Sequence, residues 1–285
     1  MISAPIKPYW SFRDELSTED SLVLKGGQVI IPTTSLREGV LQNIHQAHQG
    51  IEKSILRAKT CVYWPNITTD ITNMVNSCEI CQHHQPLQQK ETLLPHKLPT
   101  RSWHVIGSDL FYIDSIHNLL VADYYTKFPF VRKMKSTTSQ AVIEEMKSVF
   151  GEHGIPEKVV TDNGPQYASS TFAQFSKEWN FNHVTSSPTN AQSNGFIERM
   201  VRTVEGVLKK ASHSNTDPEI ALLCLRTTPI DHYIPSPSVM LYNKMIRSNL
   251  PLKASMKHHT KKSLMKDYNS AKKITRHTMT DQPKT

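Results

Sequence analysis

Two histidines and two cysteines stand at the spacing of a metal site. His45 and His48 are separated by two residues, 29 residues follow, and Cys78 and Cys81 are again separated by two. Two imidazoles and two thiolates suit tetrahedral Zn²⁺, and a Cys-x2-Cys pair can hold the ion from a turn. A segment with little core of its own would be stabilised directly by the metal. The pattern therefore predicts a structural zinc site formed by these four side chains.

Three acidic residues further along the chain are candidates for a second metal site. Asp109 lies in an apolar run, Asp162 ends another in "VVTDNGPQY", and Glu198 lies near the start of a long helical pattern. Three carboxylates that meet at one point raise one another's pKa unless cations neutralise them. Mg²⁺ prefers oxygen ligands and is held by a few carboxylates together with water and phosphate. If the fold brings the three acids together, we expect them to bind Mg²⁺ or Mn²⁺.

Each acid also has a simpler interpretation. An aspartate beside a strand end is often a turn or cap residue, and the Asp-Asn-Gly-Pro sequence at 162–165 is itself a strong turn signal. Asp123, in "VADYY", is a fourth acid of similar appearance, to which we assign a structural or surface role. The joint placement of the other three is what favours a shared site.

The zinc ligands fall on a series of predicted helices. The sequence "SLVLKGGQVIIP" at 21–32 first predicts a β-hairpin. A helix over 34–48 follows, and further helical segments are expected within 50–64 and 66–85. The apolar face of the first of these helices is expected to consist of Leu36, Val40, Leu41 and Ile44.

After Trp103 the pattern changes to strands alternating with helices. Three β-rich runs with short gaps are followed by alternating α/β units, which predicts a mixed five-stranded sheet with helices on its faces. The first and fourth strands should be neighbours, which would place Asp109 and Asp162 at one spot. The expected elements, in the order β-β-β-α-β-α-β-α, cover 104–113, 118–128, 129–134, 137–154, 156–162, 169–180, 181–187 and 194–212.

Three stretches carry a family resemblance. "GSDLF", "VVTDNGPQY" and "AQSNGFIERMVRTV", with 35 residues between Asp162 and Glu198, resemble the aspartate-aspartate-glutamate core of retroviral and gypsy-type retrotransposon integrases. The resemblance runs from about Tyr9 to Pro251 and agrees with a histidine-cysteine zinc module upstream of the core. It implies a ribonuclease-H-like fold, with Asp109, Asp162 and Glu198 as ligands of two divalent ions and as catalytic residues. The implied reactions are processing of DNA 3′ ends and transfer of those ends into target DNA.

The same resemblance implies DNA contacts around the long helix. Gln192 and Asn194, in the loop "SPTNAQSNG", would contact the DNA end. An ordinary loop with an Asn cap is the alternative for this stretch. Basic residues on the helix could reach phosphates, although solvated charges on a helix face would have the same pattern. These residues are Arg199, Arg202, Lys209 and Lys210.

The charge of the chain suits a polyanionic partner but is unevenly distributed. The chain has 285 residues and a net charge of +8. Residues 252–285 hold nine Lys/Arg and two Asp/Glu, so that the remaining residues carry 33 − 9 = 24 basic and 25 − 2 = 23 acidic side chains. The excess of +7 is thus concentrated in a tail that is expected to be disordered.

Neither a membrane span nor a secretory signal is predicted. No apolar stretch approaches the roughly 18 residues that a membrane helix needs, and the first residues lack the apolar core of a signal peptide. The two remaining cysteines, Cys61 and Cys224, lack partners at ligand spacing and are expected to be buried apolar residues. From the resemblance we expect a nuclear protein with cytoplasmic transit, homo-oligomeric, bound to the ends of an element and to target DNA.

These observations predict an α/β protein with a ribonuclease-H-like sheet, preceded by a small helical zinc-binding domain. Two other functions stay open: a host-adopted, truncated integrase-derived protein that binds DNA or another protein without catalysis, and a plain ribonuclease H or junction nuclease. The expected divisions are an N-terminal hairpin extension (1–38), a zinc-binding domain (39–84), a linker (85–102), the catalytic core (103–215), a helical and loop extension (216–251) and a basic tail (252–285).

Overall fold

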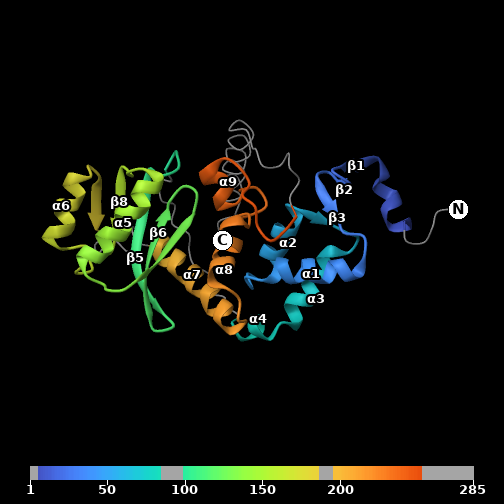
Figure 1. The fold of residues 1–285 in the computed structure, drawn as a ribbon, viewed down its shortest axis with the longest axis horizontal. Helices are drawn as coiled ribbons and strands as arrows, with labels where there is room; N and C mark the ends of the chain where they lie inside the picture. The colour runs from blue at the N-terminus through green and yellow to red at the C-terminus, as the bar shows by residue number, and fades with distance from the viewer. Residues whose placement is uncertain (1–5, 85–98, 186–194, 252–285) are drawn as a thin grey trace, which may run out of the picture. The chain divides into compact units, whose positions relative to one another are not determined.

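A computed structural model describes residues 6–84, 99–185 and 195–251 of the chain (Figure 1). Contacts divide the chain into two compact units. One unit combines the N-terminal residues up to 85 with the residues from 210 onward, and the other is formed by 86–209. Among the described residues, no helix is both long and apolar enough to cross a membrane.

The second unit contains the predicted mixed sheet. Strands β5, β6 and β7 form an antiparallel meander, and β8 and β9 extend it in parallel from β5 in the order β7-β6-β5-β8-β9. The order of elements is the one expected from the sequence, and the five-stranded, helix-flanked fold is confirmed. The elements are β5 (Val105–Ile113), β6 (Ile116–Asp123), β7 (Pro129–Met134), α5 (Ser139–His153), β8 (Lys158–Thr161), α6 (Ser170–Glu178), β9 (Asn182–Thr185) and α7 (Gly195–His213).

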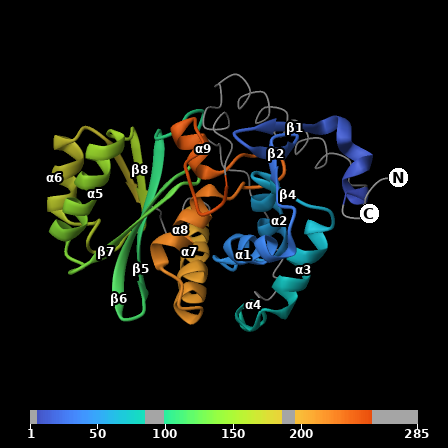
Figure 2. The same ribbon diagram turned by 45° about the vertical axis from the view of Figure 1, so that its right-hand side comes forward.

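Helices cover both faces of this sheet. Helices α5 and α6 lie on one face, and the first part of α7 lies on the other (Figures 1 and 2). Each of the first two begins at a hydroxyl cap, because Thr138 accepts from the Ala141 amide and Ser169 accepts from the Phe172 amide. The side chain of Ile197, at the start of α7, is completely buried. The sheet that carries Asp109 is therefore covered by helices on both of its faces.

The first unit contains a small four-stranded sheet near its N-terminus. The predicted hairpin forms between β2 and β3 and turns at Gly26 and Gly27, which have positive φ angles of 53° and 92°. Two further strands complete the order β1-β2-β3-β4, and β4 pairs with β3 in parallel. The N-terminal elements are η1 (Lys7–Glu15), β1 (Leu16–Glu19), β2 (Leu22–Lys25), β3 (Gln28–Ile30), α1 (Thr34–His45), α2 (Ile51–Lys59), β4 (Val62–Tyr63), α3 (Ile67–Ser77) and α4 (Glu79–His83).

One residue of the predicted apolar face of α1 lies outside the core. Ile44 is buried, but the side chain of Leu36 is 58% exposed, so its predicted burial is wrong. The next residue, Arg37, does contact the core: its guanidinium lies 5.9 Å from the ring centre of Trp64, within the range of a cation–π interaction, and donates to the Ile31 carbonyl.

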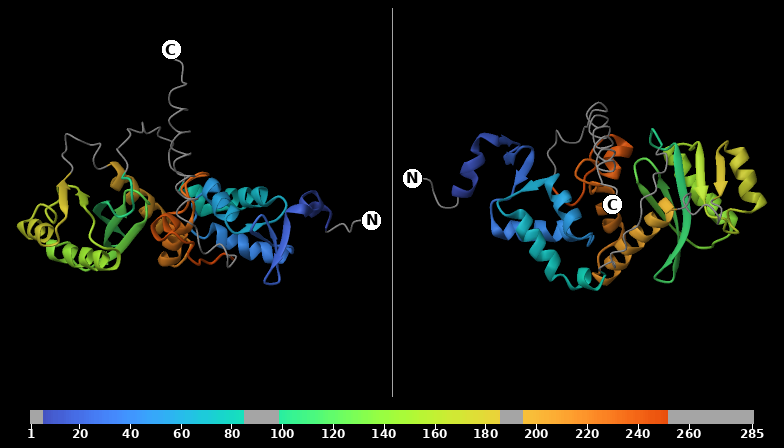
Figure 3. Two further views of the ribbon diagram at one scale, coloured as in Figure 1. Left: turned by 90° about the horizontal axis from the view of Figure 1, so that it is seen from above. Right: turned by 180° about the vertical axis from the view of Figure 1, so that it is seen from behind.

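The C-terminal segment of the chain is built into this first unit. Helices α8 (Pro218–Thr227) and α9 (Pro237–Tyr242) lie beside the N-terminal elements (Figure 3). Lys53 of α2 donates to the carbonyls of Pro229 and Ile230, which follow the end of α8. Leu250 is 4% exposed and belongs to the same apolar cluster as Trp64 and residues of α1 and α3. The extension therefore supplies part of the core of the zinc-binding unit.

A buried arginine reinforces this connection. Arg57 is 3% exposed and donates to Thr227 Oγ1 at 3.2 Å and to Asn249 Oδ1 at 2.5 Å. Cys61 and Cys224 are buried, as expected, and both lie close enough to interact electrostatically with this guanidinium. Burial is the main cause that lowers the pKa of Arg57. No carboxylate of the described residues pairs with this buried charge, so the loss of its hydrogen bonds would be costly.

We expect Leu250→Ala to destabilise the zinc-binding unit by about 2–4 kcal/mol, because a buried leucine leaves a cavity when truncated. Hydrogen exchange measured by mass spectrometry should show faster exchange in α1 and α3, with little change in β5 and β6. Leu22→Ala is the matched control, since Leu22 is 42% exposed and its loss should cost no more than about 0.5 kcal/mol. Unchanged exchange in α1 and α3 would contradict the shared core.

Candidate functional site

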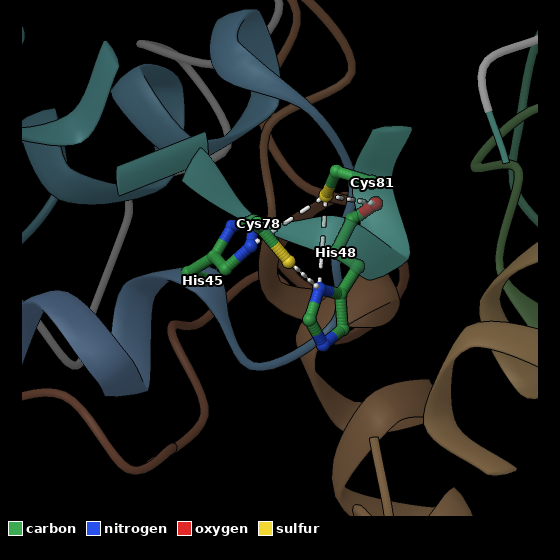
Figure 4. Close-up of side chains that lie close together, drawn as sticks. All are labelled: His45, His48, Cys78 and Cys81. Carbon is green, nitrogen blue, oxygen red and sulfur yellow. Dashed lines mark hydrogen bonds between the residues drawn. The ribbon is translucent and has the colours of Figure 1, made fainter. Parts of the chain in front are cut away.

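The four predicted zinc ligands converge on one point. One ligand atom from each of His45, His48, Cys78 and Cys81 lies within 4.8 Å of all the others. Sγ of Cys78 is 3.3 Å from Nδ1 of His48, and Sγ of Cys81 is 3.5 Å from Nε2 of His45 and 3.6 Å from Nδ1 of His48 (Figure 4). Within the described part of the chain, this is the one group of histidine, cysteine and acidic residues with such spacing.

These distances fit the edges of a zinc tetrahedron. With zinc–nitrogen and zinc–sulfur bonds of about 2.0–2.3 Å, neighbouring ligand atoms of a tetrahedral ion stand roughly 3.3–3.8 Å apart. The three nitrogen–sulfur separations fall in that range. The donor set is also the one that structural zinc sites use. The residues present therefore fit a tetrahedral zinc ion.

Local turns bring the ligands together. Helix α1 ends at His45, and His48 is reached through a turn in which its amide donates to the His45 carbonyl and its φ is +48°. The sequence had predicted one continuous helix through His48, so its end at His45 is a correction. Cys78 joins α3 to α4, and Cys81 lies within α4. Lys210 donates to the His48 carbonyl at 2.8 Å and so holds this turn from α7.

The protonation of the ligands suits a cation. Burial, followed by the charges of His45 and Lys210, lowers the pKa of His48 to about 4, so that its imidazole is neutral near pH 7. Burial and the neighbouring Cys78 raise the pKa of the Cys81 thiol to about 11. A thiolate at this position therefore needs a metal ion to stabilise its charge, and binding would release protons.

We expect one equivalent of zinc per chain, with the metal lost from Cys78→Ser. Metal analysis after dialysis measures the stoichiometry, and circular dichroism measures the loss of helix on chelation. His83→Ala serves as the control, because His83 is exposed and next to the cluster but contributes no ligand atom. A fully folded protein without zinc would rule out the structural role of the metal.

Two of the three candidate carboxylates are brought side by side by strand pairing. In the parallel pairing of β5 with β8, Ser108 lies opposite Thr161. The next residue in each strand direction is an aspartate, Asp109 on β5 and Asp162 directly after β8. Both are partly buried. The register alone therefore places these two acids next to each other at one edge of the sheet.

The third acid approaches through the start of α7. A Cβ atom at Gly107 would lie 3.2 Å from side-chain carbons of Ile197 and of Tyr124. Glycine lets the helix pack this close to β5 without displacing a neighbour, two residues before Asp109 on the same face of the strand. Glu198, which follows Ile197 in the first turn of α7, is exposed. The close packing at Gly107 thus brings the helix start to the sheet edge.

The three acids interact electrostatically. Burial, then Asp162 and more weakly Glu198, raise the pKa of Asp109 to about 6, against the hydrogen bond that it accepts from the Leu110 amide. Asp109 is therefore within reach of both other charges. The three carboxylates do not form a group as tight as the zinc ligands. Like charges repel, and a centre with two ions about 3.5–4 Å apart does not need one common contact point.

Asp162 also fulfils the turn role that was its simpler interpretation. Its Oδ1 accepts from the Gly164 amide at 3.1 Å, which closes the turn after β8. One carboxylate can hold a turn with one oxygen and leave the other available. The two interpretations of this residue are compatible.

The polar groups that support these acids were not predicted from the sequence. Tyr167 is 1% exposed, and its hydroxyl lies 2.9 Å from Oγ of Ser108. Burial, together with the negative charges of Asp109 and Asp162, raises the pKa of Tyr167, which stays protonated. The only signal in the sequence was the position of this tyrosine five residues after Asp162. A buried hydroxyl under the two aspartates keeps the base of the site polar.

The remaining candidates have separate environments. Asp123 is fully buried and accepts from the amides of Trp103 and Thr126 and from the Thr126 hydroxyl, which confirms a structural role and excludes a surface one. Arg199, Arg202 and Lys209 are exposed on α7, and Lys209 pairs with Glu205 at 3.4 Å. Gln192 and Asn194 lie outside the described residues, whereas the ammonium of Lys210 contacts the zinc-binding turn.

Comparison with known families agrees with this division. Residues 32–87 match the family described as the integrase zinc binding domain, and residues 99–191 match the integrase core domain. The chain therefore contains an integrase zinc-binding domain followed by an integrase core domain. Asp109 and Asp162 lie within the second match, and Glu198 lies seven residues beyond its end.

Similar proteins include long viral and nematode chains. The chain is 31% identical over 233 residues to an uncharacterized protein of Caenorhabditis elegans. The matched region covers 80% of this chain and 18% of the nematode protein. It is 30% identical over 210 residues to the Pro-Pol polyprotein of feline foamy virus, with 69% of this chain and 18% of the polyprotein covered. The chain thus spans about a fifth of the length of these relatives.

Similar solved structures include chains of retroviral integrases. A chain of the simian T-cell lymphotropic virus intasome in complex with a PP2A regulatory subunit is 21% identical, with a TM-score of 0.47 and 75% of this chain and 77% of that chain covered. The HTLV-2 integrase catalytic core domain in complex with magnesium is 19% identical, with a TM-score of 0.41. The match covers 50% of this chain and 98% of that domain.

We expect Asp109→Asn to stabilise the folded protein at pH 7. The raised pKa means that the ionised carboxylate disfavours folding above pH 6, and that this cost disappears as pH falls toward 4. After allowance for solvent screening, the gain should be about 1–2 kcal/mol at pH 7 and close to zero at pH 4. Denaturant unfolding at both pH values measures it. Asp114→Asn, at the exposed tip of the β5–β6 hairpin, should change neither value; an equal gain from both variants would contradict the shared site.

Proposed function

We propose that this protein is a DNA integrase of a retroelement of the gypsy type, which trims DNA 3′ ends and joins them to target DNA. The observation that carries the proposal is the meeting of Asp109 and Asp162 at neighbouring strands, with Glu198 electrostatically coupled to Asp109. The integrase core match around the two aspartates supports it. We infer that these three acids are the catalytic carboxylates.

The donor chemistry of these acids suits hard divalent cations. Mg²⁺ or Mn²⁺ would be held by oxygen ligands from Asp109, Asp162 and Glu198. The pKa of Asp109 is raised because its negative charge is buried beside other acids, and the positive charge of a bound cation would stabilise the ionised carboxylate. When bound, the ions would polarise the phosphodiester and activate the attacking oxygen. Zinc is assigned to the histidine-cysteine cluster, because thiolates and imidazoles suit it better than carboxylates do.

The protein itself would position the reacting groups. Asp109 interacts electrostatically with both Asp162 and Glu198 and would be the ligand that the two cations share. The hydrogen-bonded hydroxyls of Tyr167 and Ser108 would keep the base of the site polar. Water would act as the nucleophile in end processing, and the freed 3′-hydroxyl would act in strand transfer. No covalent bond between protein and DNA is needed, since positioning and charge neutralisation suffice for phosphoryl transfer.

We assign DNA binding to the exposed face of α7 and the loop before it. Arg199 and Arg202 follow Glu198 on the helix and are exposed, which suits phosphate contacts. Lys209, Gln192 and Asn194 are further candidates. Element ends and target DNA would be the partners of a homo-oligomer that acts in the nucleus after cytoplasmic transit.

The test uses labelled double-stranded DNA ends with Mg²⁺ or Mn²⁺. Wild-type protein should shorten the 3′ ends and join them to other DNA, and Glu198→Gln and Asp109→Asn should reduce both products by at least about 10²-fold, because each removes a charged cation ligand. Gel analysis of the products measures the rates.

Asp114→Asn is the matched control and should keep wild-type rates. Products of equal yield from wild type and Glu198→Gln would indicate a contaminating nuclease and contradict the assignment. DNA binding without any product from wild type would favour the alternative of a DNA-binding protein that has no catalytic activity.

A further inference from the structure

A histidine on the neighbouring strand touches the support of Asp162. His183 lies on β9, which pairs in parallel with β8 so that His183 is opposite Val159. Its Nε2 is 2.9 Å from Oγ1 of Thr161, the last residue of β8 and completely buried. The imidazole ring packs on Phe172, with 4.7 Å between ring centres, and Phe172 is itself fully buried. The ring therefore has a fixed place beside the strand that ends in Asp162.

The Thr161 hydroxyl links this histidine to the Asp162 backbone. Oγ1 of Thr161 donates to the carbonyl oxygen of Asp162 at 2.7 Å. A hydroxyl has one proton, and a carbonyl oxygen can only accept. Both contacts are satisfied when His183 donates its Nε2–H to Oγ1 and Thr161 donates its own proton to the carbonyl. Burial lowers the pKa of His183, so that the ring is neutral near pH 7 and one nitrogen carries the proton.

Asp162 is thus held at two points. The relay from His183 through Thr161 fixes its carbonyl, and the Gly164 amide fixes one oxygen of its carboxylate at 3.1 Å. Rotation of the peptide after Asp162 would break both contacts. The strand pairing places Asp162 beside Asp109, and these two hydrogen bonds restrain its backbone carbonyl and one oxygen of its carboxylate.

We propose that His183 is a positioning residue that holds Asp162, through the Thr161 hydroxyl, in the orientation needed to share divalent cations with Asp109. The inference rests on the proposed function, because it assigns Asp162 to cation binding. Partners that orient a metal ligand usually contribute 10- to 100-fold to metal affinity. Because His183 acts through two hydrogen bonds and on the backbone of Asp162, its contribution belongs at the lower end of that range.

Direct binding of Mn²⁺ tests the inference without need for DNA. Electron spin resonance of zinc-loaded full-length protein counts the free Mn²⁺, with Asp109→Asn as the background. His183→Phe keeps an aromatic ring but removes the donor, and should weaken Mn²⁺ binding about tenfold. His183→Gln offers an amide N–H in its place and should retain affinity within about threefold. Thr161→Val should lose as much as His183→Phe, and Thr161→Ser should lose little.

A double-mutant cycle separates the relay from packing. If the two residues act through one chain of hydrogen bonds, His183→Phe should add little further loss in the Thr161→Val background. Thermal unfolding, followed by circular dichroism, identifies any variant that fails to fold, in which case the Gln and Ser variants carry the comparison.

Four results would overturn the inference. Equal Mn²⁺ affinity in wild type and His183→Phe would remove the positioning role while leaving the proposed cation site intact. Equal losses in His183→Phe and His183→Gln, or additive losses in the cycle, would assign the effect to packing alone. Absence of Mn²⁺ binding by the wild type, beyond the Asp109→Asn background, would overturn the proposed function and this inference together.

Discussion

The parallel pairing of β5 with β8 is the constraint on which the site depends. Ser108 and Thr161 are paired in this register, and the residue after each is an aspartate. A slip of one residue would turn one of the two side chains to the opposite face of the sheet. The glycine at 107 and the buried Ile197 then bring α7 close to the same edge. The site is therefore a product of register and close packing, with the turn after β8 adjusted by local hydrogen bonds.

The zinc centre follows a different physical principle. Its ligands come from helix ends and turns, such as the left-handed turn at His48 and the junction at Cys78. The pKa of the His48 imidazole is lowered and that of the Cys81 thiol is raised, so both are neutral near pH 7 until a cation binds. A zinc ion held by the four side chains would join the end of α1 to the junction of α3 and α4.

The sequence was sufficient for the parts of the molecule that depend on local patterns. Ligand spacing identified His45, His48, Cys78 and Cys81, and strand and helix periodicity gave the order of elements in the sheet. Parts that depend on distant contacts escaped prediction. β4 has two residues and exists because β3 pairs with it, and Leu36 is exposed although it belongs to the apolar pattern of α1. The hydrogen bond between His183 and Thr161 joins residues 22 apart and leaves no pattern in the sequence.

The zinc-binding unit is discontinuous along the chain, and this affects how it can form during synthesis. Its core uses Leu24 and Trp64 from the start of the chain and Leu250 from near its end. Sheet strands β5 to β9 and their helices lie wholly between these segments. On the ribosome, helices α1 to α4 therefore emerge before the sheet but lack part of their apolar core until Leu250 has been made, whereas the sheet can close before then. Translation thus sets an order of assembly in which the first unit to appear is the last one to be completed.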